Sequence, residues 1–176
     1  IITEIYAKYE LELKKSNSLD FDDLLIKTLH LLSEDDEVLS YYANRFKYVH
    51  IDEFQDTNTV QYKIAKLLTS KHKNIFVVGD DDQSIYSFRG ANFRNILDFP
   101  KIFPDTKIIK LEQNYRSSQN ILNLTNEIIE RAKEKYTKNL FSEITSDEKP
   151  ALICTNDMQM EAEFVSQRIL ELQEMD

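Results

Sequence analysis

Two adjacent carboxylates, Asp52 and Glu53, stand directly after the short, largely apolar run 48–51. If this run is a buried strand of a parallel sheet, both side chains emerge at its carboxyl edge, where open α/β folds bind their ligands. Mg²⁺ prefers oxygen ligands and keeps several waters, so one carboxylate together with phosphate oxygens suffices to hold it. The second carboxylate can then orient an attacking water or accept its proton. An exposed acidic strand end would show the same pair, but the string that continues through residues 54–58 weakens that interpretation.

A second chemical signal follows the run 75–79, which is rich in β-branched residues and ends in a glycine. Three aspartates at 80–82 come next, and then Gln83, whose amide can bond a phosphate or a water. The aspartates are equally explained as a solvated turn, and this alternative stays open. A calcium-binding EF-hand loop is not expected, because its glycine and its closing glutamate are missing at the required spacing.

Aromatic and basic residues interleave just after this turn, at Tyr86, Phe88 and Arg89. Exposed aromatic rings beside an arginine suit the stacking of single-stranded bases, at roughly 1–3 kcal/mol per base. Rings of this kind also occur in protein cores, and the sequence leaves that alternative open.

The third signal is the string LEQNYRSS at 111–118, between an expected strand and an expected helix. Arg116 can present a rigid, planar cation to a phosphate, and Tyr115 can stack on a base or on adenine. Ser117 and Ser118 are typical capping residues for the helix that follows. The same string also fits a core tyrosine and an arginine paired with a surface glutamate.

The segments around these strings alternate between helical and strand-like patterns, which is typical of βαβ units and a mostly parallel sheet. Asp20 is expected to be the N-cap of one helix, with Asp23 as its capping-box partner. The polar, patternless stretch 139–150 predicts a loop. The expected helices cover residues 1–15, 21–32, 34–44, 59–70, 117–133 and 158–173, and the expected strands cover 48–52, 75–79, 107–111 and 151–155.

Composition is that of an ordinary globular protein. The 176 residues, 41% of them hydrophobic, suffice for one α/β domain with a sizeable core. No apolar run approaches the roughly 18 residues that a membrane span needs. Cys154 is the single cysteine, which excludes an internal disulfide and predicts a small buried side chain in a strand-like run. These features favour a reducing, cytoplasmic setting. The net charge of −9 adds no support for nucleic-acid binding, although a local basic cluster can exist within an acidic chain.

Taken together, the order and wording of the three strings resemble the UvrD/PcrA/Rep group of superfamily 1 DNA helicases. The string DFDDLL at 20–25 is also similar to that family. The resemblance implies a RecA-like motor core, an α/β fold of the P-loop NTPase type with a parallel sheet and flanking helices. It further implies that residues 1–17 end an inserted helical 1B subdomain, that residues 18–115 form the C-terminal half of motor domain 1A, and that residues 116–176 begin motor domain 2A.

The resemblance assigns nucleotide-binding roles, with ATP and Mg²⁺ as the cofactors. Asp52 matches the family's Mg²⁺-binding aspartate and Glu53 its catalytic glutamate, and both carboxylates are expected at the Mg²⁺. Gln83 matches the glutamine that senses the γ-phosphate and couples the nucleotide to DNA. Tyr115 matches the adenine-stacking tyrosine, and Arg116 matches the γ-phosphate-binding arginine.

The resemblance also implies DNA contacts through Tyr86, Phe88 and Arg89, which match the family's strand-contacting aromatic residues and arginine. The Phe88 position is often tryptophan in these helicases, so stacking there is expected to be weaker. The implied activity is that of an ATP-dependent 3′→5′ DNA helicase and translocase, and only the resemblance supplies the polarity. Single-stranded DNA and junctions of single- and double-stranded DNA are the implied partners, with repair proteins as further candidates.

The departure from the family pattern concerns the phosphate-binding loop. Neither Gly79 nor Gly90, the two glycines, begins the string G-x-x-x-x-G-K-[ST], so these residues hold no P-loop. The chain starts at Ile1 and stops within a charged helical pattern, which suggests an internal piece of a longer helicase. Because such enzymes work by positioning and charge stabilisation, we expect the piece alone to be inactive.

Three other functions stay open. The motor of a recombination helicase-nuclease would look similar in these residues. A non-catalytic DNA- or protein-binding module on the same fold would explain the missing P-loop, although the intact Asp52, Glu53, Gln83 and Arg116 argue against it. A metal-dependent nuclease built on the acidic cluster would be recognised by DNA cleavage with divalent metal.

Overall fold

The computed structural model describes residues 1–175 and divides into two compact units. The first unit holds Ile1–Lys110 and Lys133–Thr137, and the second holds Leu111–Ala132 and the chain from Lys138 onward. The first division follows Lys110, close to the domain boundary expected after residue 115. The assignment of the three subdomains stays a prediction.

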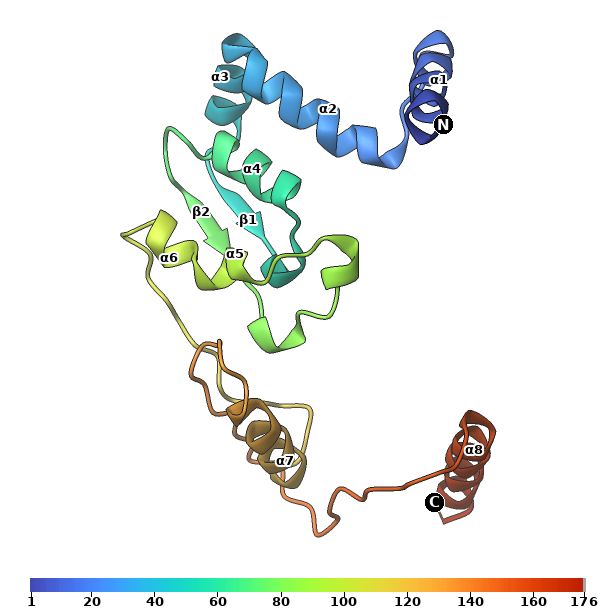
Figure 1. Cartoon of the computed structure of the whole chain (residues 1–176). Helices are drawn as coiled ribbons and strands as arrows, with labels where there is room; N and C mark the ends of the chain where they lie inside the picture. The colour runs from blue at the N-terminus through green and yellow to red at the C-terminus, as the bar shows by residue number, and fades with distance from the viewer. Residues whose placement is uncertain (176) are drawn as a thin grey trace. The chain divides into compact units, whose positions relative to one another are not determined.

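The elements of each unit alternate between helices and short strands, and Figure 1 labels the α-helices and strands along the coloured chain. No helix among residues 1–175 is long and apolar enough to cross a membrane. Expected helices form with their ends shifted by a few residues. The first unit contains α1 (Ile2–Lys15), α2 (Phe21–Glu34), α3 (Asp36–Arg45), β1 (Val49–Ile51), α4 (Thr59–Leu68), β2 (Ile75–Val77), α5 (Arg94–Leu97), α6 (Phe99–Ile102) and the 3₁₀ turns η1 (Phe54–Asp56), η2 (Asp81–Gln83) and η3 (Ser87–Arg89); the second contains α7 (Gln119–Glu130) and α8 (Met158–Met175).

Strands β1 and β2 pair in parallel, which confirms the expected βαβ arrangement with α4 as the crossover (Figure 1). The register sets Ile51 beside Val77. Val78 N donates to Ile51 O at 2.9 Å, and Phe54 N donates to Val78 O at 2.9 Å. The ladder of hydrogen bonds therefore continues past the end of β1 and fixes the turn that carries Asp52 and Glu53.

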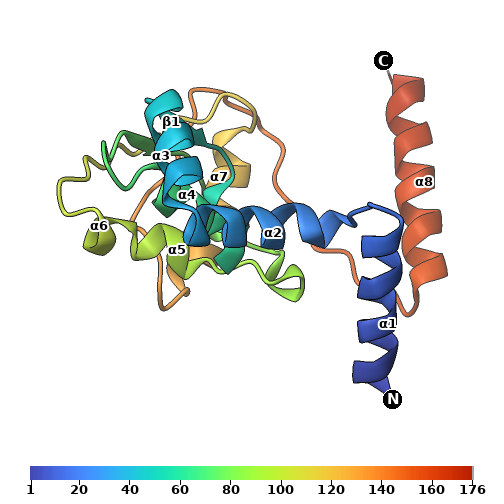
Figure 2. The same ribbon diagram turned by 90° about the horizontal axis from the view of Figure 1, so that it is seen from above.

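Helix α2 begins with the capping box that the sequence predicts. Asp23 N donates to Asp20 Oδ1 at 2.8 Å, and the Asp23 carboxylate accepts from Asp20 N at 3.5 Å. Tyr9 of α1 donates its hydroxyl to Asp20 Oδ2 at 2.9 Å. The hydrogen bond from the Asp23 backbone, and then that from Tyr9, lower the pKa of the Asp20 carboxyl. Figures 1 and 2 show α1 beside this end of α2.

Helices α2, α3 and α4 pack against one another, as both views show. Each contains a buried apolar residue: Leu32 in α2, Ala43 in α3 and Ala65 in α4. Thr69, fully buried after the end of α4, donates its hydroxyl to Ala65 O at 2.8 Å, so its polar group is satisfied.

The buried core cluster is largely aromatic and centres on Phe54, which is fully buried. Its ring meets Phe99 of α6 edge-to-face, with centroids 5.6 Å apart, and Phe99 stacks on Phe103 at 4.7 Å. Ile96 of α5 completes the buried cluster. Since Phe54 immediately follows Glu53, burial of its ring anchors the acidic turn to the core.

The second unit corrects three expectations. Residues 107–111, which lead into this unit, and residues 151–155 form no strand, although both runs are rich in apolar residues. Among the described residues of this unit, strand-like pairing is restricted to an isolated parallel bridge between Gln113 and Phe141. Cys154 is exposed, so the expectation of a buried thiol was wrong. Helix α7 forms as expected and buries Leu122, which is 3% exposed.

Candidate nucleotide and DNA site

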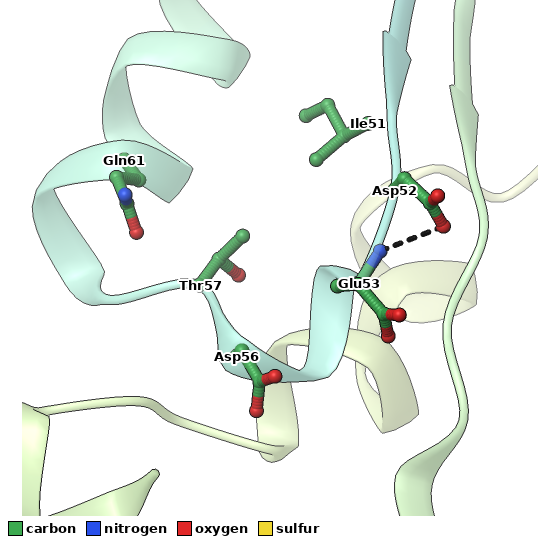
Figure 3. Close-up of a pocket in the computed structure, with 6 residues that line it drawn as sticks. All are labelled: Ile51, Asp52, Glu53, Asp56, Thr57 and Gln61. Carbon is green, nitrogen blue, oxygen red and sulfur yellow. Dashed lines mark hydrogen bonds between the residues drawn. The ribbon is translucent and has the colours of Figure 1, made fainter. Parts of the chain in front are cut away.

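The two carboxylates predicted to be catalytic lie at the carboxyl end of β1, as expected for a ligand-binding edge. Both side chains are exposed, and Asp52 Oδ1 accepts a hydrogen bond from Glu53 N at 2.9 Å (Figure 3). This bond turns one oxygen of Asp52 back toward the chain. The short turn η1 follows at once and is closed by Asp56 N, which donates to Glu53 O at 2.9 Å.

Glu53 has a left-handed backbone conformation, with φ 49° and ψ 44°. Residues other than glycine rarely adopt it, at a cost on the order of 1–2 kcal/mol. The ladder from β2 on one side and the buried Phe54 ring on the other hold the turn in place. Strain of this kind gathers at functional sites, where the surrounding structure fixes a side chain in one direction.

An open hollow of about 340 Å³ lies against this turn, and Figure 3 shows the six side chains that line it. Three of them are the carboxylates of Asp52, Glu53 and Asp56. Asp56 Oδ1 is buried and has no hydrogen-bond partner among the described residues. Carboxylate oxygens, one of them without a partner, are the donor set that a hard cation such as Mg²⁺ prefers, so these residues fit that metal.

Gln83 ends the turn η2, and its Nε2 donates to Asp80 Oδ2 at 2.7 Å. Asp80 N in turn donates to Gln55 Oε1 at 3.0 Å, and Gln55 Nε2 donates to Glu53 Oε2 at 2.8 Å. The structure thus joins Glu53 to Gln83 through Asp80, which the sequence analysis noted only as part of an acidic turn, and through Gln55, which it did not single out. The signal was present only in the polar string that continues after the carboxylate pair.

The three consecutive aspartates lie with one oxygen of each within 4.8 Å of the others. They are engaged within the fold: Asp80 accepts from Asp82 N at 3.1 Å as well as from Gln83, and Asp81 Oδ2 accepts from Tyr136 N at 2.8 Å. We therefore assign them to the structure of the turn and to the attachment of the returning segment Lys133–Thr137.

Tyr86, Phe88 and Arg89 form one exposed cluster on and beside η3. The ring centroids of Tyr86 and Phe88 are 5.9 Å apart, and the Arg89 guanidinium carbon lies 5.2 Å from the first and 5.5 Å from the second. Phe88 is 76% exposed, so its ring is not part of the core. Tyr86 and Arg89 also line a hollow of about 300 Å³ together with Asp56. This cluster offers a cation and two rings to a flat ligand.

Tyr115 and Arg116 belong to the second unit, where both are exposed. The Tyr115 hydroxyl donates to Gln113 Oε1 at 2.9 Å. Asn114 Oδ1 accepts from Arg116 N at 2.9 Å and from Ser117 N at 2.7 Å, which shapes the turn that presents the arginine. Asn114 was missed by the sequence analysis, although an asparagine just before a helix is a common turn signal.

The expected serine caps are only half right. Ser118 occupies the N-cap of α7 but makes no side-chain capping bond, and Asn114 serves Ser117 N instead. The roles of the residues predicted to bind nucleotide and DNA stay predictions.

Comparison with known proteins gives matches over nearly the whole chain. Residues 1–104 match the UvrD/REP helicase N-terminal domain, and residues 109–176 match the UvrD-like helicase C-terminal domain. The ATP-dependent DNA helicase PcrA of Staphylococcus aureus (strain NCTC 8325 / PS 47) is 46% identical over 173 residues, 98% of this chain. That of Staphylococcus epidermidis (strain ATCC 12228 / FDA PCI 1200) is 44% identical over the same length. The chain spans 24% of the length of these relatives.

Proposed function

Since the chain belongs to the UvrD/REP helicase family, we propose that it is part of an ATP-dependent DNA helicase that moves 3′→5′ along single-stranded DNA. The observation that carries the proposal is the carboxylate pair Asp52 and Glu53 at the carboxyl end of β1, joined by hydrogen bonds to the loop of Gln83. The relatives are named ATP-dependent DNA helicases, which supports the same activity for the whole protein.

At the nucleotide site, the proposed cofactor is ATP with Mg²⁺, which supplies the phosphoanhydride and a cation that neutralises phosphate charge. Asp52 would provide the carboxylate that holds the metal. Glu53 would accept a proton from the water that attacks the terminal phosphorus, with ADP as the leaving group. Both residues are exposed at the open hollow, within reach of solvent water. Gln83 detects the terminal phosphate from its place beside Asp80.

In the second unit, Arg116 provides a cation for the terminal phosphate and Tyr115 a ring that stacks on adenine. Both side chains are exposed on a turn that Asn114 fixes through two backbone N–H groups. A planar guanidinium matches the geometry of phosphate oxygens, which supports this role for Arg116.

The DNA-binding surface is the cluster of Tyr86, Phe88 and Arg89. Its two rings and its guanidinium are exposed and close together, an arrangement that suits stacked bases and a negatively charged backbone. Because the loop of Gln83 leads directly into this cluster, a change at the nucleotide reaches the DNA surface through a few residues. We further propose junctions of single- and double-stranded DNA and repair proteins as partners, and the cytoplasm as the location.

Strand displacement by the full-length protein tests this proposal. We expect ATP and Mg²⁺ together to drive unwinding of a duplex with a 3′ single-stranded tail, and little unwinding of the same duplex with a 5′ tail. Unwinding from the 5′ tail alone would refute the polarity. Binding to both substrates without any unwinding would favour a non-catalytic module, and DNA cleavage would favour a nuclease.

A further inference from the structure

Gln55 is an amide side chain buried beside the acidic pair, with 1% of its surface exposed. Its Nε2 donates to Glu53 Oε2 at 2.8 Å and to Asp56 Oδ2 at 3.3 Å. Its Oε1 accepts from Asp80 N at 3.0 Å. Both ends of the amide therefore bond to groups in segments that the proposed function uses.

The chemistry of these partners requires an amide here. The nitrogen faces two carboxylates, which only accept, and the oxygen faces a backbone N–H, which only donates. A glutamate in its place would set a third carboxylate against Glu53 and Asp56. A methionine of similar length would fill the space but leave Asp80 N without its acceptor. The surrounding groups therefore also determine which terminal atom of the Gln55 amide is the oxygen and which is the nitrogen.

Resting on the proposed function, we propose that Gln55 is the positioning residue of the site: it holds the Glu53 carboxylate in its working direction and locks it to the loop that ends in Gln83. Glu53 has a left-handed backbone and an exposed side chain, so little else restrains its carboxylate. The hydrogen bond from the buried Gln55 Nε2 restrains the exposed Glu53 carboxylate. A displacement of about 1 Å at a reacting group can cost roughly a hundredfold in rate, so such a restraint matters for catalysis.

The position of Gln55 is also supported by the residues that follow β2. An added Cβ at Gly79 would lie 2.7 Å from Gln55 Oε1, so the absence of a side chain at Gly79 is what lets the amide reach Asp80 N. Ser84 donates its hydroxyl to Gln55 O at 3.4 Å. Asp80 and Ser84, on either side of η2, therefore both bond to Gln55. Gln55 in this way connects the Glu53 carboxylate with the loop that leads to the DNA-binding cluster.

A double-mutant cycle in the full-length helicase tests the inference. Steady-state and single-turnover ATP hydrolysis are measured, with single-stranded DNA present, for the wild type, Gln55→Met, Glu53→Gln and the double variant. We expect Gln55→Met alone to lower kcat about 10- to 100-fold, the range seen when a supporting partner of a site residue is lost, and to change KM for ATP less than about threefold. In the Glu53→Gln background we expect Gln55→Met to change the residual rate less than about twofold, because the group it positions is gone.

A control separates positioning from loss of stability. Thr69→Val removes a buried hydroxyl that bonds only near the end of α4, so we expect it to lower the melting temperature and to leave both kinetic constants unchanged. If Gln55→Met lowers the rate by the same factor in both Glu53 backgrounds, Gln55 acts on the fold and the inference is wrong. A wild-type kcat in Gln55→Met also overturns it, while the proposed function survives. A wild-type protein without DNA-stimulated hydrolysis overturns the proposed function itself, and the inference falls with it.

Discussion

Gly79→Ala is expected to destabilise the first unit strongly, although Gly79 does not have a left-handed backbone. An added Cβ would lie 2.7 Å from Gln55 Oε1, 2.9 Å from Ile96 Cδ1 and 3.2 Å from Phe54 N. Contacts below 3.0 Å force a shift, but Gln55 is held by its hydrogen bonds and Ile96 is buried in the core. Overpacking costs about 1–3 kcal/mol, and the loss of the Gln55–Asp80 bond adds about 1 kcal/mol. We therefore expect a loss of roughly 2–4 kcal/mol in the free energy of unfolding.

Urea unfolding followed by circular dichroism measures this loss, and Gly90→Ala is the matched control. Gly90 has φ 81° and nothing within 4 Å of an added Cβ, so its substitution costs only backbone strain, about 1–2 kcal/mol. Ile96→Val removes the Cδ1 atom near Gly79, and should cost less in the Gly79→Ala background than in the wild type. The reasoning is refuted if Gly79→Ala costs less than Gly90→Ala, or if Ile96→Val costs the same in both backgrounds.

Three further outcomes are expected. Asp20→Asn keeps the helix cap but removes its charge. Because the folded-state pKa of Asp20 is lowered, its contribution to folding stability is present above the ordinary carboxyl pKa and is lost as pH falls through the folded value. The urea midpoints of wild type and variant should therefore differ at neutral pH and converge in acid, and a difference that stays constant with pH would contradict this. Phe88→Ala should weaken binding of an oligothymidylate by roughly 1–3 kcal/mol in a fluorescence titration, and Phe88→Trp should strengthen it. The control Phe21→Ala, at the exposed start of α2, should leave the affinity unchanged. Equal affinities for all of these variants would exclude Phe88 from the DNA surface. The 176-residue chain alone should hydrolyse no ATP above background in a phosphate-release assay, since it holds no P-loop, and any turnover lost in Glu53→Gln would contradict this.

Local signals in the sequence predicted much of the first unit. The capping box at Asp20 depends on neighbours a few residues away, and it forms as expected. The strands ending near Asp52 and Gly79 also form, because each is the other's partner. Runs 107–111 and 151–155 have similar composition but form no strand. A strand needs a partner elsewhere in the chain, and these runs have no ladder partner among the described residues; Ile109 and Leu152 are largely exposed.

For the candidate site too, the sequence predicted the features set by residue type and order but not those set by distant contacts. Residue type and order were enough to single out Asp52, Glu53, Gln83 and the aromatic cluster as candidates. The role of Gln55 depends on Asp80 N, 25 residues further along the chain, and the turn with the left-handed Glu53 is held by the bond from Phe54 N to Val78 O. Sequence periodicity does not predict such contacts. From sequence alone, a polar residue in a polar string is predicted to be exposed, and only its hydrogen-bond partners explain why it is buried.

ATP hydrolysis by the full-length protein, with and without single-stranded DNA, tests the central claim most directly when wild type and Glu53→Gln are compared. We expect DNA to stimulate the wild-type rate strongly, and we expect Glu53→Gln to leave only a small residual turnover while ATP still binds, because the substitution removes only the proton acceptor at the end of β1. A rate indifferent to DNA, or one that Glu53→Gln does not lower, would contradict the assignment of this carboxylate as the catalytic base of a DNA-driven motor.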